Sequence, residues 1–165
     1  MNKISLDERK LRYTLMFLIK LIVLSLPLYV FLELNIGLDP LQSFIAQHVF
    51  YFLKMTGMNP NMNGFSISLD KTSIIINKDC TGWKGILFFS ALVLSTSSSW
   101  KKRIWGILIG IPSIFSVNIL RIIVMIWIGI NSPEFFQLIH DILWQSSMIL
   151  LVLILWIIWW RNNIF

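Results

Sequence analysis

The sequence predicts an all-α integral membrane protein, a four-helix transmembrane bundle with an outer amphipathic helix and a small β-hairpin between its first two spans. The first observation is composition: 56% of the 165 residues are hydrophobic and only 13% are charged, about half the charged share of an ordinary soluble domain. The second is a set of four apolar stretches, each near or above the roughly 18–20 residues that cross a hydrocarbon core. The third is the placement of basic residues beside those stretches, where they orient a membrane protein. An ordinary cytosolic enzyme is excluded, and a nucleic-acid-binding protein is disfavoured despite the net charge of +6.

The first predicted span covers residues 13–34 and follows a basic N-terminal segment. This start resembles a signal peptide, but the apolar run is too long and lacks a small-x-small cleavage site. We therefore expect a retained helix. Lys20 interrupts the run near its basic end, and we interpret it as a lysine whose aliphatic stem carries the ammonium group towards the headgroups.

An outer segment, 35–80, separates the first span from the second and begins with a predicted helix. Asp39-Pro40 is a typical helix start, and the apolar residues that follow recur near helical spacing. Gly57 is a typical stop. The pattern predicts an amphipathic helix that lies on the membrane surface.

A small β-hairpin is predicted after this helix. The apolar runs 65–69 and 72–76 flank Asp70-Lys71, and turn-forming residues precede them. This hairpin leads the chain to Cys80, at the outer mouth of the second span.

The remaining spans are predicted at 81–98, 104–130 and 138–160. The third span is long enough to tilt, and Pro112 is expected to kink it. Gly106 and Gly110 have GxxxG spacing, which lets another helix approach closely. We interpret this pair as a packing feature.

Charge placement predicts the orientation of the four spans. Eight basic residues fall on one side, namely Lys3, Arg9, Lys10, Arg12, Lys101, Lys102, Arg103 and Arg161. Because basic flanks stay inside, we expect both termini in the cytoplasm of a multi-pass cell-membrane protein. The segments 35–80 and 131–137 are then expected outside, with any active site at that face.

This topology brings three polar residues to one depth. Cys80 begins the second span at the outer surface, and His140 begins the fourth span at the same surface. Arg121 lies in the third span, roughly 26 Å along the helix from its cytoplasmic end at 1.5 Å per residue. The three residues are therefore predicted near the outer ends of three different helices.

Arg121 is the strongest single anomaly, because a charged guanidinium group within hydrocarbon costs at least about 2.5–3.5 kcal/mol on insertion scales. Asn118 lies one turn earlier on the same helical face, so the pair predicts a polar stripe that points into the bundle. We favour a functional charge. The alternative is a structural ion pair with Asp79 or Asp141, or a side chain that snorkels to the outer headgroups.

Cys80 is the only cysteine, so an internal disulfide and a CxxC motif are excluded. It lies where an outer loop meets a predicted helix N-terminus, a setting in which a helix dipole and a nearby cation lower a thiol pKa. Gly82 permits close backbone approach by a substrate or a neighbouring helix. A lone cysteine in an apolar bundle is also commonly a packing residue. The position of Cys80 in the chain, rather than the presence of a cysteine, therefore favours a nucleophile.

Cysteine, histidine and arginine together supply what acyl transfer needs: a thiol nucleophile, a proton carrier and a cation for the developing oxyanion. His140 alone is also typical of a hydrogen-bonded helix end. The other histidine, His48, is predicted at an exposed position of the outer helix. A metal site is disfavoured because Cys80, both histidines and an acid would have to converge without local ligand spacing. No cofactor is predicted, since Gly-rich phosphate loops and other short catalytic motifs are missing from the sequence.

These residues resemble the exosortase/archaeosortase family of integral-membrane cysteine transpeptidases. The matching features are Cys80-Thr81-Gly82 at the head of one span, the 118–122 stretch containing Arg121 within the next, and His140 at the head of the last. The resemblance covers roughly residues 78–160. The chain is more similar to a compact archaeosortase than to bacterial exosortases with additional spans.

The resemblance implies processing of exported proteins that end in a short recognition motif, a transmembrane helix and a basic tail. Cys80 would attack the peptide bond outside that helix to give a thioester, and Arg121 would stabilise the oxyanion or position the thiolate. His140 would protonate the leaving amine and later activate the acceptor, which the archaeal branch implies to be an amine-bearing membrane lipid. Asn118 and Asp141 are expected to orient Arg121 and His140, or to satisfy a packing contact or a helix end.

Two alternatives stay open at this point. A purely hydrolytic membrane cysteine protease would use the same residues with water as the acceptor. A non-enzymatic polytopic membrane protein, such as a transporter component or an assembly partner, would leave Cys80 incidental and make Arg121 a structural or ligand-binding charge.

Overall fold

The fold comes from a computed structural model that describes residues 2–34, 36–69 and 72–162. Within these ranges, the side chains of residues 2–7, 72, 133, 135 and 137–145 lie outside the description. In order, the described elements are α1 (Asn2–Glu33), α2 (Asp39–Met55), β1 (Asn61–Asn63), β2 (Ser66–Leu69), β3 (Thr72–Ile75), the 3-10 helix η1 (Lys78–Thr81), α3 (Trp83–Ser95), α4 (Trp100–Asn131) and α5 (Pro133–Arg161).

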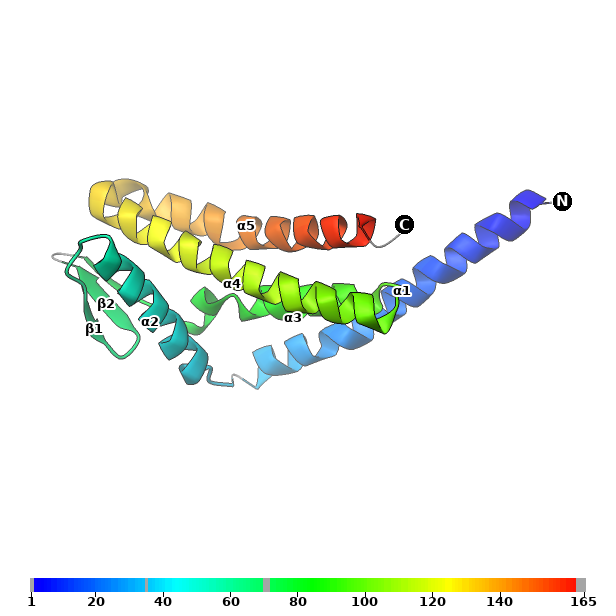
Figure 1. Ribbon diagram of the computed structural model, residues 1–165, viewed down its shortest axis with the longest axis horizontal. Coiled ribbons are helices and arrows are strands. Elements are labelled where there is room, and N and C mark those ends of the chain that lie inside the picture. The colour runs from blue at the N-terminus through cyan, green and yellow to red at the C-terminus, as the bar shows by residue number, and fades with distance from the viewer. Residues whose placement is uncertain (1, 35, 70–71, 163–165) are drawn as a thin grey trace.

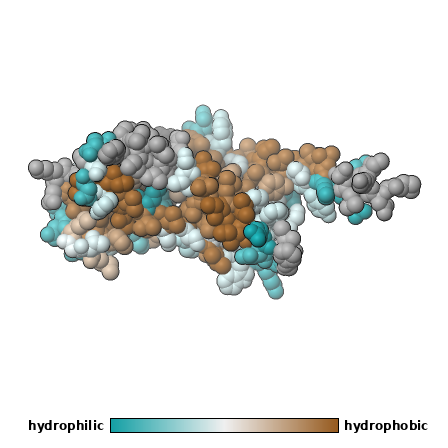
Figure 2. All heavy atoms as spheres, turned by 90° about the horizontal axis from the view of Figure 1, so that it is seen from above, coloured by the Kyte–Doolittle hydropathy of each residue, from teal (hydrophilic) through white to brown (hydrophobic). Residues whose placement is uncertain are grey.

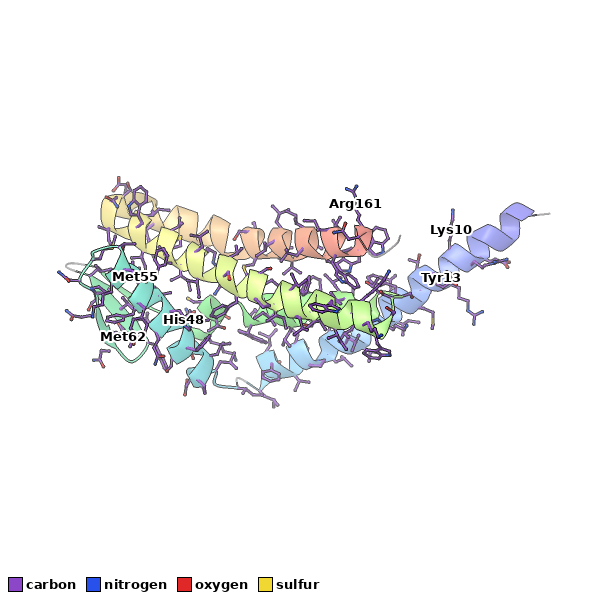
Figure 3. The ribbon with its side chains drawn as sticks, viewed as in Figure 1. Lys10, Tyr13, His48, Met55, Met62 and Arg161 are labelled. Carbon is purple, nitrogen blue, oxygen red and sulfur yellow. The ribbon has the colours of Figure 1, made fainter. Side chains whose placement is uncertain are left out.

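The molecule is elongated, with α3, α4 and α5 packed side by side along its length (Figure 1). α1 packs along α3, and its N-terminal half extends beyond the other helices. α2 and the small sheet lie at the end where α4 turns into α5, and both termini lie towards the opposite end. The labelled side chains show the same division: Lys10 and Arg161 lie towards one end, and His48, Met55 and Met62 towards the other (Figure 3). The fold therefore separates the basic flanks from the inserted segment.

Two described helices are long and apolar enough to cross a membrane by length and composition, α1 over Glu8–Glu33 and α4 over Trp100–Asn131. α3 has 13 residues, about 20 Å of helix, which is shorter than the roughly 30 Å hydrocarbon core. The predicted span 81–98 is cut at both ends, because Gly82 adopts a left-handed conformation and the helix ends at Ser95. In α5, the described apolar segment is Ser146–Arg161. The arrangement of four spans stays a prediction.

Apolar side chains cover much of the molecular surface (Figure 2). Large hydrophobic residues are exposed along α1, α4 and α5, including Ile22 at 65%, Ile109 at 63% and Leu150 at 59%. Soluble monomers rarely expose contiguous apolar surface on this scale. The exposed faces of these helices therefore suit a lipid environment.

The predicted outer helix is confirmed as α2, which starts at Asp39-Pro40 and is followed by Gly57 at φ 84°. Its buried stripe packs against the sheet and α4. At one edge of this stripe, the buried Gln42 side-chain amide donates a 3.0 Å hydrogen bond to the Ile76 carbonyl. The apolar face of α2, which was expected to lie on the membrane surface, is thus buried against the sheet and α4.

The predicted hairpin is confirmed, because β2 and β3 pair antiparallel with Ser66 opposite Ile75 and Leu69 opposite Thr72. The predicted turn at Asp70-Lys71 lies outside the described residues. β1 adds a third strand on the far side of β2, which the sequence did not indicate. Its residues Asn61–Asn63 are largely polar and exposed, so they lack the apolar alternation of a half-buried strand.

The GxxxG glycines of α4 are packing positions, as predicted. A Cβ atom at Gly106 would overlap the Trp159 ring of α5, and one at Gly110 would overlap the Phe89 ring of α3. The two glycines therefore admit aromatic side chains from two different neighbouring helices, which brings α3, α4 and α5 together. Pro112 lies within the continuous α4, and the kink expected there stays a prediction.

Candidate active site

Cys80 lies in η1, the short 3-10 turn that connects the sheet to α3. It is 8% exposed and belongs to the apolar cluster formed by α2, the sheet and α4. The predicted position at a junction of loop and helix is confirmed. The thiol is, however, inside the protein rather than at an open surface.

Asn77 holds both the backbone and the thiol of Cys80. Its side-chain oxygen Oδ1 lies 3.0 Å from the Cys80 backbone nitrogen and 3.0 Å from Sγ. Because the backbone N–H can only donate, the atom that it meets is the amide oxygen. The thiol therefore also donates to this oxygen, and Asn77 fixes the direction in which Sγ points its proton.

Asn118 ties α4 to the cysteine. Its amide nitrogen Nδ2 donates a 2.8 Å hydrogen bond to the Cys80 carbonyl, and the side chain is fully buried. The sequence placed Asn118 on a polar stripe with Arg121, which lies three residues further along α4. In the structure, its described hydrogen bond goes to Cys80 itself.

Gly82 makes this contact possible. It adopts φ 75° between η1 and α3, a conformation that favours glycine. A Cβ atom there would lie 3.1 Å from Cγ of Asn118. The close approach predicted at Gly82 is therefore made by a side chain of a neighbouring helix.

Arg121 and Cys80 line the same cavity, as the predicted convergence requires. This cavity has a volume of about 320 Å³ and lies between β3, η1 and α4, with Ile122 and Met125 on its α4 wall. Arg121 also lines a second cavity of about 350 Å³. Arg121 thus lines two cavities, and Cys80 lines one of them.

The second cavity has both apolar and charged side chains in its lining. Its apolar wall comes from three helices and consists of Leu28, Phe88, Met148, Ile149 and Val152. Arg121, Asp79 and Lys84 supply its charged side chains. The amine of Lys84 lies 2.7 Å from the carboxylate of Asp79, and both side chains are about half exposed. This shape suits an amphiphile with a polar end.

Burial raises the pKa of Cys80 to about 11, above its ordinary value of 9.0. The Asn77 backbone and the positive charge of Arg121 lower that pKa in part, and the negative charge of Asp79 raises it. The lowered thiol pKa expected from the sequence is therefore wrong in direction. The loss of hydration outweighs the nearby cation, so the resting side chain is a neutral thiol.

His140 and Asp141 fall within α5, but their side chains lie outside the described residues. His48 is exposed on α2, as predicted, and its Nδ1 lies 2.7 Å from the Phe44 carbonyl oxygen. Among the side chains that the structure describes, no three His, Cys, Asp or Glu residues are placed to hold a metal ion.

Asn77 is the site residue that sequence analysis missed. A signal was present, because asparagine three residues before a cysteine is the spacing of an N-cap whose side chain reaches the backbone N–H at N3. The predicted strand 72–76 ends one residue before Asn77, and no capping role was predicted for this asparagine.

A family model described as transmembrane exosortase matches residues 6–160 of this chain. No curated protein and no solved structure matched. The matched region contains every residue of the candidate site.

Proposed function

The chain belongs to the transmembrane exosortase family, and from this premise we propose that it is a membrane-embedded cysteine transpeptidase with Cys80 as its nucleophile. The family acts on exported proteins that carry C-terminal sorting signals. The substrate would be such a protein, cleaved just outside its C-terminal transmembrane helix. The observation that carries this proposal is the cavity shared by the only cysteine and by Arg121.

In the first half-reaction, Sγ of Cys80 attacks the carbonyl carbon of the scissile peptide bond. The thiol proton passes to the His140 imidazole, because a thiol with a raised pKa needs a base at the moment of attack. Arg121 stabilises the oxyanion of the tetrahedral intermediate. The C–N bond then breaks, the imidazolium gives its proton to the leaving amine, and a thioester remains on Cys80.

In the second half-reaction, an amine acceptor attacks the thioester carbonyl. The imidazole takes the proton from the attacking amine. The C–S bond then breaks, and the imidazolium gives this proton to the leaving sulfur, which regenerates the thiol. The second cavity that Arg121 lines supports a membrane lipid as the acceptor, because its apolar side chains suit acyl chains. The Asp79 carboxylate, which is paired with Lys84, also attracts a cationic amine. If water attacks instead, the same residues give hydrolysis.

The proposed orientation places both termini in the cytoplasm and the Cys80 site at the extracytoplasmic face. The separation of Lys10 and Arg161 from the sheet and α2 supports it (Figure 3). A substrate helix with a basic tail follows the same rule and would present its cleavage site at the same face.

The test is co-expression of the chain with an exported protein from the same cell that ends in a transmembrane helix and a basic tail. We expect Cys80→Ala and His140→Ala to abolish release of the C-terminal helix at normal expression level. Arg121→Lys keeps the charge but loses the planar fork, so it should reduce processing strongly. His48→Ala is the matched control, because it removes the other histidine from an exposed position on α2.

Cleavage that persists in Cys80→Ala would rule out the transpeptidase and favour the non-enzymatic alternative. Mass spectrometry of the processed C-terminus separates transfer from hydrolysis. An added lipid amine indicates transfer, and a free carboxylate indicates a protease.

A further inference from the structure

β3 is an outer strand of the described sheet, with β2 on one side only. The Ile76 N–H donates to the Phe65 carbonyl at 2.9 Å, and Ile74 lies opposite Ile67, so the Ile76 N–H and the backbone groups of Ile74 face β2. In an antiparallel pair, the residues between them direct their N–H and C=O groups to the other side. Ser73 and Ile75 therefore present backbone donors and acceptors along the outer edge of β3.

The cavity that contains Cys80 follows this edge. Five consecutive residues, 73–77, line it. Alternate side chains of a strand point to opposite faces, so a cavity that meets only one face would contact every second residue. Contact with all five indicates that the cavity runs along the strand edge, and its lining also includes Cys80.

The rest of the cavity lining comes from two helices, one of which, α4, also contacts β3. These residues are Arg121, Ile122 and Met125 of α4 and Phe136 of α5. At about 3.3 Å per residue, the five lining residues span roughly 13 Å between Ser73 and Asn77. This length accommodates about four residues of an extended chain.

We propose that the segment of the substrate before its cleaved bond binds as an added strand on the outer edge of β3. This inference rests on the proposed function, because that function requires an extended peptide to bring its carbonyl to Cys80. Backbone hydrogen bonds to Ser73 and Ile75 would hold the substrate with little demand on its side chains. The apolar wall from α4 would select side chains on one face of the added strand.

The added strand runs parallel to β3. The chain itself passes from the sheet through η1 into α3, that is, from the outer segment into the bundle. A substrate that leads from an exported domain into a membrane helix must cross the site in the same sense.

The experiment uses the full chain in detergent micelles and a defined probe, acetyl-Ala-Val-Ala-Ala chloromethyl ketone. The Cys80 thiolate displaces chloride and forms a thioether, which intact-mass spectrometry measures. Cys80→Ala, which removes the only cysteine, corrects for alkylation of the two histidines. Four further probes each carry one N-methyl group at a different residue. Iodoacetamide, which needs no strand pairing, reports the reactivity of the thiol itself.

We expect N-methylation to slow alkylation in an alternating pattern. Two probes methylated at alternate residues should react about fivefold more slowly, the effect of one net hydrogen bond, and the other two should react almost as the parent does. Ile75→Pro removes an outward N–H and leaves the bonds to β2 in place, so it should slow the parent probe by a similar factor. Ile75→Val is its control, and neither variant should change the rate with iodoacetamide.

Uniform slowing by all four methyl groups, or no slowing by any, would overturn edge binding. Edge binding would also be overturned if iodoacetamide labels Cys80 and the parent probe does not. It would be overturned as well if neither reagent labels Cys80, because the groove then does not reach the thiol. Failure of the proposed function is seen separately, as substrate cleavage that persists in Cys80→Ala.

Discussion

The protonation state of Cys80 decides how the proposed nucleophile is activated, and its pH dependence can be measured directly. With the pKa near 11 instead of 9.0, the thiolate fraction at pH 7 falls from about one in a hundred to about one in ten thousand. We therefore expect the iodoacetamide rate of the folded chain to rise with pH to a midpoint well above 9. The same chain unfolded in SDS should titrate near the ordinary value, which provides the reference.

Two variants test the causes of this raised pKa. Arg121→Gln removes a cation that lowers the pKa of Cys80, so the midpoint should rise. Asp79→Asn removes a charge that raises it, so the midpoint should fall, by less than about one pH unit because this half-exposed carboxylate is screened and paired with Lys84. A midpoint at or below 9 in the unmodified chain would refute the conclusion that burial dominates.

The same raised pKa affects folding. The native state holds the thiol proton more tightly than the unfolded chain does, so the resulting stability is present below pH 9 and is lost as the pH rises towards 11.

Three substitutions test the contacts around Cys80 and the packing of α4 by thermal unfolding in detergent. Gly82→Ala should lower the free energy of unfolding by about 1–2 kcal/mol, because alanine is strained at φ 75° and its Cβ presses on Asn118. Asn118→Ala should cost about 1–3 kcal/mol, since it leaves the buried Cys80 carbonyl without its donor. Gly110→Ala should cost about 1–3 kcal/mol through overlap with the Phe89 ring.

Gly37→Ala is the control for these substitutions. The nearest atom to a Cβ atom there lies 3.8 Å away, an ordinary contact, so the stability should hardly change. Equal melting temperatures for Gly110→Ala and Gly37→Ala would contradict the packing described for α4.

Much of the fold could be predicted because it depends on local patterns. The helix from Asp39, the hairpin of β2 and β3 and the long α4 each follow from a start signal, an alternation or an apolar run. The length of α3 could not be predicted in the same way. Uncharged residues continue the predicted span 81–98 past both ends of α3, and only the left-handed Gly82 and the extended Thr96 limit the helix.

The candidate site shows a similar division. The convergence of Cys80 and Arg121 followed from topology, since each was placed near one end of its helix. The raised pKa of Cys80 did not, because burial depends on how α2 and the sheet cover η1. The contact from Asn118 to the Cys80 carbonyl joins residues 38 positions apart, and no local pattern specifies such a bond. The position of the His140 side chain stays a prediction.

The bond from Asn118 to Cys80 has a consequence for a membrane protein that meets bilayers of varying thickness. A long helix such as α4 responds to thickness by changing its tilt, which would separate catalytic groups attached to different elements. Here the cysteine turn is fastened to α4 one helical turn before Arg121. We therefore expect Cys80 and Arg121 to move together as α4 tilts. The distance between them should then stay the same in membranes of different lipid composition.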